Sequence, residues 1–294
     1  MYNGIVIAGA TAVGKTALSI ELAKKLDAVI ISADAMQVYK KMNIGTSKIT
    51  SFEMQGIKHY MLDVVEPDEH FDVGMYYDMV NDILKKEKKI PILVGGTGLY
   101  ISAITDGLTK MPSVDKEYRK ELNKKSKEEL IEMLKGKIDL ETIDINNPVR
   151  LIRKIETLGI EHNNIKGNDK NFLKIFLERD RENLYDRINE RVNKMVDEGL
   201  ILEAKNIYDN YNIENIKAIG YKELFSYFKN EIDLEYAISE IAKNSRRYAK
   251  RQLTWFRNKK DYVRYNLCAI SEENIVDDIT HIFKEGQLWI LKTI

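Results

Sequence analysis

A phosphate-binding loop lies close to the start of the sequence. Residues 9–16 read GATAVGKT and match the pattern G-x-x-x-x-G-K-[ST]. The stretch before it, Gly4–Gly9 (GIVIAG), is short, β-branched and ended by glycine, which predicts a buried parallel strand. Residues 15–26 follow with an apolar spacing that suits a helix. This context favours a functional loop over a turn that merely happens to be rich in glycine.

The residue types of this loop predict its chemistry. Gly9 and Gly14 let the backbone curl, so that several N–H groups point at one anion. The helix that follows directs its positive end to the same place. Lys15 adds a point charge, and the hydroxyl of Thr16 can hold Mg²⁺. The motif therefore predicts a phosphate site, but it leaves open whether the phosphates belong to ATP or to another molecule.

Strand-like and helix-like segments alternate over the first part of the chain. Further buried strands are predicted at 28–32, 59–65 and 90–94, and helices at 73–88 and after the glycines that follow residue 94. This alternation predicts an α/β fold, a parallel sheet with helices on both faces. Together with the phosphate-binding loop, it indicates a sheet like that of the P-loop NTPases.

The pattern changes after about residue 111. Residues 113–160 are charged and mostly helical in pattern, and they contain no clear strand. Residues 172–177 (FLKIFL) predict one more buried strand, and 184–259 look helical throughout. We therefore expect a core with a helical C-terminal region and a helical insertion domain. The expected bounds are 1–112 and about 170–294 for the core, and about 113–169 for the insertion.

Composition excludes several classes of protein. Lys and Arg together number 46, as do Asp and Glu, so a nucleic-acid site would need positive charge gathered locally. The single cysteine, Cys268, excludes an internal disulfide and suits a reducing cytosol. Four scattered histidines make no zinc pattern. No apolar run is long enough to span a bilayer, so no membrane partner is expected. We expect a cytoplasmic protein, and we expect it to be a monomer.

Two polar residues follow predicted strands at the edge where open α/β sheets bind ligands. Asp34, in ISADAMQVY, comes after the second strand and suits a general base, a metal ligand or a hydrogen-bond acceptor. The cap of a following helix is an equally good interpretation. Thr97, in GGTGLY, follows the fourth strand among glycines that permit close approach to a ligand. A tight turn from strand to helix is the alternative there.

A positively charged segment lies towards the C-terminus. Residues 243–264 contain nine Lys or Arg residues and one acid, Asp261. The basic residues at its centre are Arg246, Arg247, Lys250 and Arg251, and the interleaved rings are Tyr248, Trp255, Phe256 and Tyr262. Basic side chains neutralise phosphates and flat rings stack on bases, whereas the alternative is a solvated helix face over a buried aromatic stripe. We favour RNA contact for the charges and packing for most of the rings.

Eight stretches of the sequence, in order from residue 9 to residue 257, resemble one family. They read GATAVGKT, ISADAMQVYKKMNIGTSK, HYMLDVVEP, PILVGGTGLYI, NPVRLIRKIE, LYDRINERVNKMVDEGL, AIGYKE and RRYAKRQLTWFR. The family is that of the tRNA dimethylallyltransferases, also called tRNA isopentenyltransferases. Any one stretch is weak by itself, but eight in the family's order are highly specific.

The resemblance implies a prenyl transfer. Members of the family move a dimethylallyl group from its diphosphate to N6 of adenosine 37, 3′-adjacent to the anticodon, in tRNAs that read codons beginning with U. The products are N6-isopentenyladenosine and diphosphate. The implied partners are thus dimethylallyl diphosphate and the anticodon stem-loop of tRNA. The implied diphosphate site, with Mg²⁺ held by Thr16, comprises Gly9, Ala10, Thr11, Ala12, Val13, Gly14, Lys15 and Thr16.

The resemblance also assigns roles to single residues. Asp34 matches the general base, Thr97 the threonine that orients donor and acceptor, and Lys15 the lysine of the loop. The target adenine must leave the anticodon-loop stack to reach them. The implied tRNA contacts are Asp34, Ala35, Met36, Gln37, Thr97, Arg119, Val149, Arg150, Leu151, Ile152, Arg153, Arg246, Arg247, Lys250 and Arg251.

One departure from the family pattern concerns this site. Position 35 is Ala where Ser is usual, which removes a hydroxyl beside the implied base.

Two other functions share the phosphate-binding loop. A small-molecule kinase would need an arginine-rich lid, for which Arg179, Arg181, Arg187 and Arg191 are available. The positively charged segment and the stretch DAMQ at residues 34–37 favour the transferase over the kinase. An RNA-binding, NTP-dependent switch would leave Asp34 and Thr97 without a role.

Overall fold

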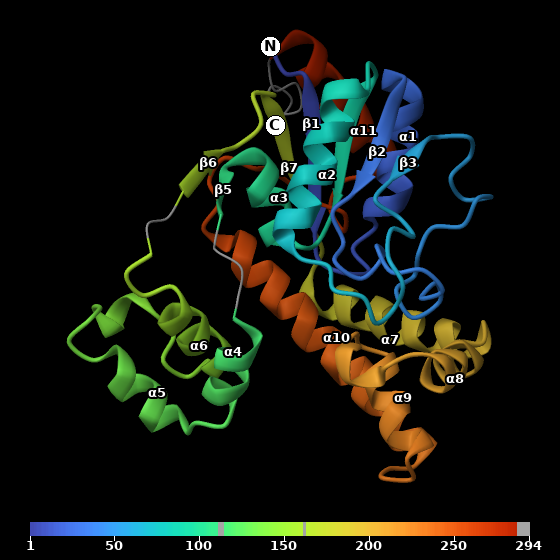
Figure 1. The fold of residues 1–294 in the computed structure, drawn as a ribbon. Coiled ribbons are helices and arrows are strands. Elements are labelled where there is room, and N and C mark those ends of the chain that lie inside the picture. Colours follow the sequence, from blue (N-terminus) through green and yellow to red (C-terminus); the bar gives the residue numbers. More distant parts are fainter. Residues whose placement is uncertain (111–114, 161–162, 287–294) are drawn as a thin grey trace. The chain divides into compact units, whose positions relative to one another are not determined.

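The chain forms two compact units (Figure 1). The first combines Met1–Asp106 with the chain from Gly167 onward, and the second is Gly107–Lys166. The second unit starts and ends earlier than the insertion that the sequence predicts at about 113–169. The computed structural model describes residues 1–110, 115–160 and 163–286.

A six-stranded parallel sheet forms the centre of the first unit, with strand order β3-β2-β4-β1-β7-β8. This confirms the predicted α/β fold with a parallel sheet. The loops after the neighbouring strands β2, β4 and β1 therefore meet at one edge. The strands are β1 (Gly4–Gly9), β2 (Ala28–Ser32), β3 (His59–Tyr60), β4 (Ile90–Gly95), β7 (Phe172–Glu178) and β8 (Val263–Asn266).

Two edge strands differ from the sequence-based expectation. The strand predicted at 59–65 ends at Tyr60, because Met61 and Asp63 adopt left-handed backbone angles, with φ of 63° and 54°. Extended strands exclude such angles. The strand β8 was not predicted, since four residues at the end of a charged segment carry too little pattern. It pairs with β7 and completes the sheet.

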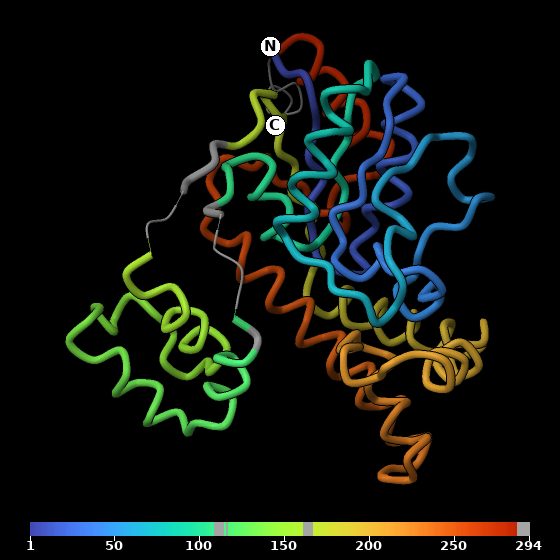
Figure 2. Tube along the Cα trace, in the orientation of Figure 1, coloured from blue at the N-terminus to red at the C-terminus, as the bar shows by residue number. Residues whose placement is uncertain are grey.

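Helices cover both faces of the sheet. Along β1, Ile5 and Ile7 face one hydrophobic cluster and Val6 and Ala8 face another, as the alternation of a strand requires. The first cluster lies under α1 (Lys15–Leu26) and α11 (Glu272–Glu285), and the second under α2 (Val73–Lys86) and α3 (Gly98–Thr105). Figure 2 shows the C-terminal α11 returning to the N-terminal part of the chain.

The C-terminal part of the first unit adds a helical layer, as predicted. Its helices are α7 (Arg181–Asp197), α8 (Leu200–Asn210), α9 (Tyr221–Phe228) and α10 (Leu234–Arg257). A third cluster holds them together, including Val192 and Ile241. The long α10 also contributes Ala249 and Phe256 to the two clusters of the sheet, so it joins the helical layer to the sheet (Figure 1).

The second unit is a small helical body closed by two short strands. The antiparallel strands are β5 (Gly107–Lys110) and β6 (Asn163–Lys166), which the sequence did not predict because GLTK and NNIK lack an apolar alternation. Its core includes Leu122, Leu130 and Leu151. The helices are α4 (Lys116–Asn123), α5 (Lys127–Leu134) and α6 (Pro148–Glu156), with a 3-10 turn at Leu140–Thr142.

Candidate active site at the carboxyl edge of the sheet

The phosphate-binding loop joins β1 to α1 in the shape that its glycines predict. Gly14 has φ 117°, and Ala12 also adopts a left-handed angle of 62°. A side chain at Gly9 would place its Cβ 2.7 Å from the Leu177 carbonyl oxygen, so the loop passes close against β7. Successive amides in such a curl form a concave anion site at the positive end of α1.

Lys15 lies inside this curl. Its Nζ donates to the carbonyl oxygens of Gly9 at 3.0 Å and Ala10 at 2.8 Å. Burial lowers the pKa of Lys15 to about 8, partly offset by the negative charge of Asp34, while Arg191 lowers it further. A dianionic group bound here would stabilise the ammonium form, so the site favours an anionic ligand.

Asp34 lies directly after β2, at the same edge. Its Oδ1 accepts the backbone N–H of Met36 at 2.9 Å, which closes a local turn. The segment that follows is a turn, so the alternative interpretation of Asp34 as a helix cap is wrong. Among the residues that the structure describes, no hydrogen bond engages the second oxygen, Oδ2. Asp34 thus keeps a carboxylate oxygen for a ligand.

Thr97 lies beside Asp34, after the neighbouring strand β4. Its Oγ1 accepts the backbone N–H of Ala35 at 3.0 Å, and its own N–H donates to the Ala33 carbonyl oxygen at 3.2 Å. A Cβ on Gly95 would lie 2.1 Å from that same carbonyl oxygen. The glycine is therefore needed for the close approach of the two strand ends. Sequence reasoning placed both Asp34 and Thr97 correctly at this edge.

Arginines from the start of the helical layer reach the phosphate-binding loop. Arg179 Nε donates to the Val13 carbonyl oxygen at 2.8 Å, and Arg187 Nε donates to that of Ala12 at 2.9 Å. Both support the curled backbone of the loop. From the sequence, these arginines were candidates only for the lid of a kinase. A linear pattern does not show which carbonyl oxygen a distant guanidinium contacts.

Arg191 has a different position from these two. Its Nη1 donates to Thr11 Oγ1 at 2.8 Å and its Nε to Ser47 Oγ at 2.6 Å. Burial lowers its pKa, and the charge of Asp34 counteracts this. Arg191 is thus a functional candidate that the predicted site did not include. Its neighbours in the sequence, Asn189 and Glu190, do not distinguish it from any other arginine on a helix.

A cavity of about 410 Å³ lies beside the phosphate-binding loop, which contributes Thr11 to its lining. One end is polar, with Thr11, Asp34, Thr97 and Arg191. The remaining lining residues come from the loop after β2, from α7, from the segment before α9 and the first turn of α9, and from α10. They are Ala35, Met36, Gly45, Thr46, Ile188, Val192, Met195, Lys217, Ala218, Ile219, Lys222, Ile241, Ser245, Tyr248 and Arg251.

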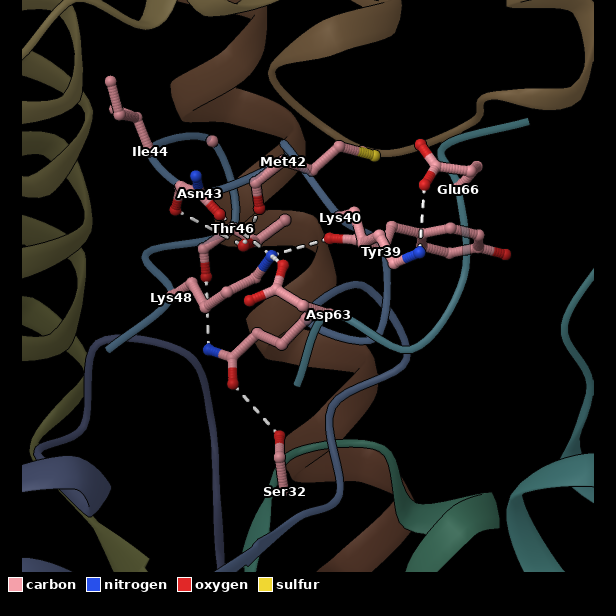
Figure 3. Close-up of polar contacts among 12 residues, drawn as sticks. Ser32, Tyr39, Lys40, Met42, Asn43, Ile44, Thr46, Lys48, Asp63 and Glu66 are labelled. Atoms are coloured by element: carbon pink, nitrogen blue, oxygen red, sulfur yellow. Dashed lines mark hydrogen bonds and ion pairs between the residues drawn. The ribbon is translucent and has the colours of Figure 1, made fainter. Parts of the chain in front are cut away.

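A network of polar contacts holds the loop between residues 39 and 48, which contributes Gly45 and Thr46 to the cavity (Figure 3). The buried Lys48 donates to the Tyr39 carbonyl oxygen at 2.6 Å, to Asn43 Oδ1 at 3.0 Å and to Asp63 Oδ1 at 2.6 Å. Because all three of its donors are used, Lys48 serves the loop and does not project a charge into the cavity.

Glu203 on α8 holds the same loop from its other side. Its carboxylate accepts the backbone N–H groups of Asn43, Ile44 and Gly45 at 2.8–3.0 Å, and the hydroxyl of Tyr221 at 2.6 Å. The cavity wall is thereby tied to the helical layer. Sequence reasoning missed Glu203, which occupies an ordinary exposed-looking position on a helix.

The Gln37 side chain is also engaged within the protein. It accepts from Ser32 Oγ at 3.0 Å and donates to the carbonyl oxygens of Thr46 and Ser47 at 3.4 and 3.3 Å. Met36 and Ala35, by contrast, line the cavity. Among the implied tRNA contacts at residues 34–37, Gln37 therefore supports the cavity wall in this structure.

The basic residues of α10 fall on more than one side of that helix. Arg251 lines the cavity, Arg247 and Lys250 are exposed, and Arg246 donates to Asn189 Oδ1 at 2.5 Å. The expected packing role holds for Phe256 and Tyr262, which are buried, whereas Trp255 is 43% exposed and Tyr248 lines the cavity. The lining position of Tyr248 was not anticipated.

The remaining implied tRNA contacts lie in the second unit. Leu151 and Ile152 are buried in its core, so Val149 and Arg150 are the residues of that stretch with exposed side chains. Arg119 makes a two-pronged ion pair with Glu156, at 2.6 and 2.5 Å. The pair joins α4 to α6 and occupies the guanidinium within the unit.

Comparisons with known proteins place the chain in a family. A family model described as IPP transferase matches residues 37–259. The chain is 46% identical over 296 residues to a tRNA dimethylallyltransferase of Fusobacterium nucleatum, covering 96% of this chain and 98% of the relative. It is 45% identical over 276 residues to a tRNA dimethylallyltransferase of Bacillus mycoides, covering 87% of each.

A solved structure agrees with this relationship. It is the full-length tRNA isopentenylpyrophosphate transferase of Bacillus halodurans, with a TM-score of 0.74 and 40% identity over 97% of this chain and 96% of that one. In the described part of this chain, no helix has the length and apolar character to cross a membrane. From the sequence match, the fold and the coverage, the chain belongs to the IPP transferase family of tRNA dimethylallyltransferases.

Proposed function

We propose that the cavity at the carboxyl edge of the sheet transfers a dimethylallyl group from dimethylallyl diphosphate to N6 of adenosine 37 in tRNA. The observation that carries this proposal is a cavity lined by Thr11 of the anion site, by the carboxylate of Asp34 and by apolar side chains. The anion site suits a diphosphate, the carboxylate suits a proton acceptor, and the apolar lining suits a prenyl chain.

The phosphate-binding loop holds the leaving group in this proposal. Loop amides, the ammonium of Lys15 and the guanidinium of Arg191 surround the position of the diphosphate. Negative charge on the diphosphate grows as the C–O bond to the prenyl group breaks. Cations that the fold already holds beside this loop stabilise that charge, which lowers the barrier.

Asp34 and Thr97 act on the acceptor. The lone pair of the adenine N6 attacks C1 of the prenyl group, a C–N bond forms, and the electron pair of the C–O bond leaves with the diphosphate. The nitrogen then gives up a proton, which the free oxygen of Asp34 accepts. Thr97, fixed by the Ala35 N–H, orients the reacting groups.

The residues present fit a magnesium ion that is bound chiefly through the substrate. The described residues contain no cluster of three or more His, Cys, Asp or Glu side chains able to hold a metal. Thr16, exposed at the start of α1, offers a hydroxyl, which is the usual protein ligand of Mg²⁺ beside bound phosphates. Bound there, Mg²⁺ would neutralise charge on the diphosphate.

The exposed basic residues of α10 supply the tRNA contact. Arg247 and Lys250 face solvent on the helix whose Tyr248 and Arg251 line the cavity. Backbone phosphates near the flipped nucleotide would be neutralised there. The exposed Val149 and Arg150 of the second unit provide further candidate contacts.

A label-transfer assay tests the proposal. Unmodified tRNA is incubated with enzyme, Mg²⁺ and either dimethylallyl diphosphate labelled in the prenyl group or ATP labelled at the γ-phosphate. Prenyl label should enter tRNA without ATP, and nuclease digestion should place it at adenosine 37. Label from ATP entering any acceptor, or no prenyl transfer by folded enzyme, would refute the proposal.

A further inference from the structure

We infer that Met195 and Ile241 close the apolar end of the cavity and restrict the donor to a single isoprene unit. The inference rests on the proposed function, since it takes the donor diphosphate to lie at the phosphate-binding loop. It assigns donor selectivity to two side chains that touch neither the loop nor Asp34.

One wall of the cavity is a stripe along α7. Ile188, Arg191, Val192 and Met195 line it, at spacings of three, four and seven residues that share one helix face. Arg191 is anchored to Thr11 at the polar end. Met195 lies four residues further along the helix, about 6 Å away along its axis. From Arg191 to Met195 the wall therefore passes from cationic to apolar over about the length of a short prenyl chain, while Ile188 lies on the other side of Arg191.

The facing stripe on α10 shows the same gradient. Ile241, Ser245 and Tyr248 line the cavity at spacings of four and seven residues. Tyr248 lines the cavity together with Asp34, and burial and the negative charge of Asp34 raise its pKa to about 12. Ile241 lies about 10 Å from Tyr248 along the helix axis. Two helices thus agree on which end of the cavity is apolar.

The chemistry of the apolar end suits a hydrocarbon better than a base. Val192, Met195, Ala218 and Ile241 offer no side-chain donor or acceptor there. An adenine pressed against them would leave ring nitrogens without partners, which is costly when buried. A prenyl chain has no such groups, and it gains from leaving water.

The side chains that form the apolar end are also buried. Val192, Ala218 and Ile241 are 3%, 4% and 1% exposed, and Met195 is 8% exposed. Behind them the third hydrophobic cluster continues with Leu200, Ala204 and Leu224, so the floor of the cavity is backed by packed side chains. A second isoprene unit would have to displace this packing, which close-packed interiors resist.

The test compares dimethylallyl and geranyl diphosphate as donors to the same tRNA. Met195→Ala and the milder Ile241→Val should each raise the ratio of kcat/KM for geranyl over dimethylallyl diphosphate, by roughly tenfold or more for Met195→Ala. Ile207→Val is the matched control, since Ile207 is equally buried in the same cluster but does not line the cavity. Its ratio should stay at that of the wild type.

The outcomes separate this inference from the proposed function. An unchanged donor ratio in both folded variants would overturn the inference, and a rise in the KM for tRNA with no change in donor ratio would assign the apolar end to the acceptor base. If instead the wild-type enzyme failed to transfer the dimethylallyl group, the proposed function itself would fall. Thermal unfolding of each variant shows whether Met195→Ala has folded, and Ile241→Val supplies the answer if it has not.

Discussion

The hydroxyl oxygen of Thr97 accepts the backbone N–H of Ala35 at 3.0 Å, across 62 positions of the sequence. The bond links the ends of β4 and β2, which are neighbours in the sheet. Asp34 precedes Ala35, so its carboxylate is held at a set position relative to Thr97. The donor is a main-chain group, so the bond does not depend on the serine that the family usually has at position 35.

Thr97→Val should reduce turnover and stability together. Valine has nearly the same shape but no acceptor, so the Ala35 N–H would be left without its partner, at a cost of about 1–3 kcal/mol. Thr97→Ser keeps the oxygen and should retain most of both. Chemical denaturation and single-turnover prenyl transfer measure the two effects, and equal turnover in the Val and Ser variants would contradict a role for the hydroxyl.

Asp34→Asn should lower kcat by roughly 10²- to 10⁴-fold, the range for losing a general base. The amide keeps the size of the side chain and can still accept the Met36 N–H, so tRNA affinity should change little. Asp27→Asn is a suitable control, because Asp27 is an exposed helix cap outside the cavity. Unchanged kcat in Asp34→Asn would remove Asp34 from the proton transfer.

The pH dependence of donor binding should report Lys15. Burial lowers its pKa in the folded protein to about 8, from an ordinary lysine value of 10.5. The ammonium form binds diphosphate, so kcat/KM for the donor should fall as pH rises through about 8. Once diphosphate is bound, the charged form is stabilised and the corresponding fall in kcat should move to higher pH. If kcat and kcat/KM fell at the same pH, the titrating group would not be Lys15.

The same pKa predicts a trend in stability. Between pH 8 and 10.5 the unfolded chain carries a proton on Lys15 that the folded chain has lost. The contribution of Lys15 to the free energy of unfolding should therefore rise with pH in this window. Lys15→Met lacks the titration, so denaturant unfolding at several pH values should show a flatter dependence for this variant than for the wild type.

Glu203→Gln should loosen the cavity wall without touching a substrate. The carboxylate serves three backbone N–H groups and the Tyr221 hydroxyl, and an amide offers only one acceptor oxygen. We expect a loss of about 1–3 kcal/mol in the free energy of unfolding and a raised KM for the donor. Glu198→Gln, exposed at the end of α7, should leave both unchanged. An unaltered donor KM would show that the wall tolerates the change.

Salt should weaken tRNA binding through the exposed cations of α10. Each phosphate contact contributes about 0.7–0.9 to the slope of log K against log salt concentration. Arg247→Gln and Lys250→Gln should each reduce the slope by about that amount, while Lys284→Gln, at the end of α11, should not. Filter binding over a range of salt measures this, and identical slopes would exclude these two side chains from phosphate contact.

Local patterns predicted the elements that carry most of the chemistry. The bounds of β1, α1 and β2 match the structure. The two strands are continuous apolar segments, and α1 has the apolar spacing of a helix. The short strands β5, β6 and β8 escaped detection, because four residues carry little periodicity and their pairing depends on a distant partner. The early end of β3 depends on left-handed residues whose types, Met and Asp, give no warning of it.

The sequence by itself determined the phosphate-binding loop, the parallel sheet behind it and the placement of Asp34 and Thr97 at one edge. These depend on contacts within a few residues and on the rule that parallel strands share a carboxyl edge. Only the tertiary structure decided that Arg191 meets Thr11, 180 positions away, and that Glu203 and Lys48 hold the cavity wall. Such contacts join groups that the chain brings together only on folding, so no local spacing encodes them.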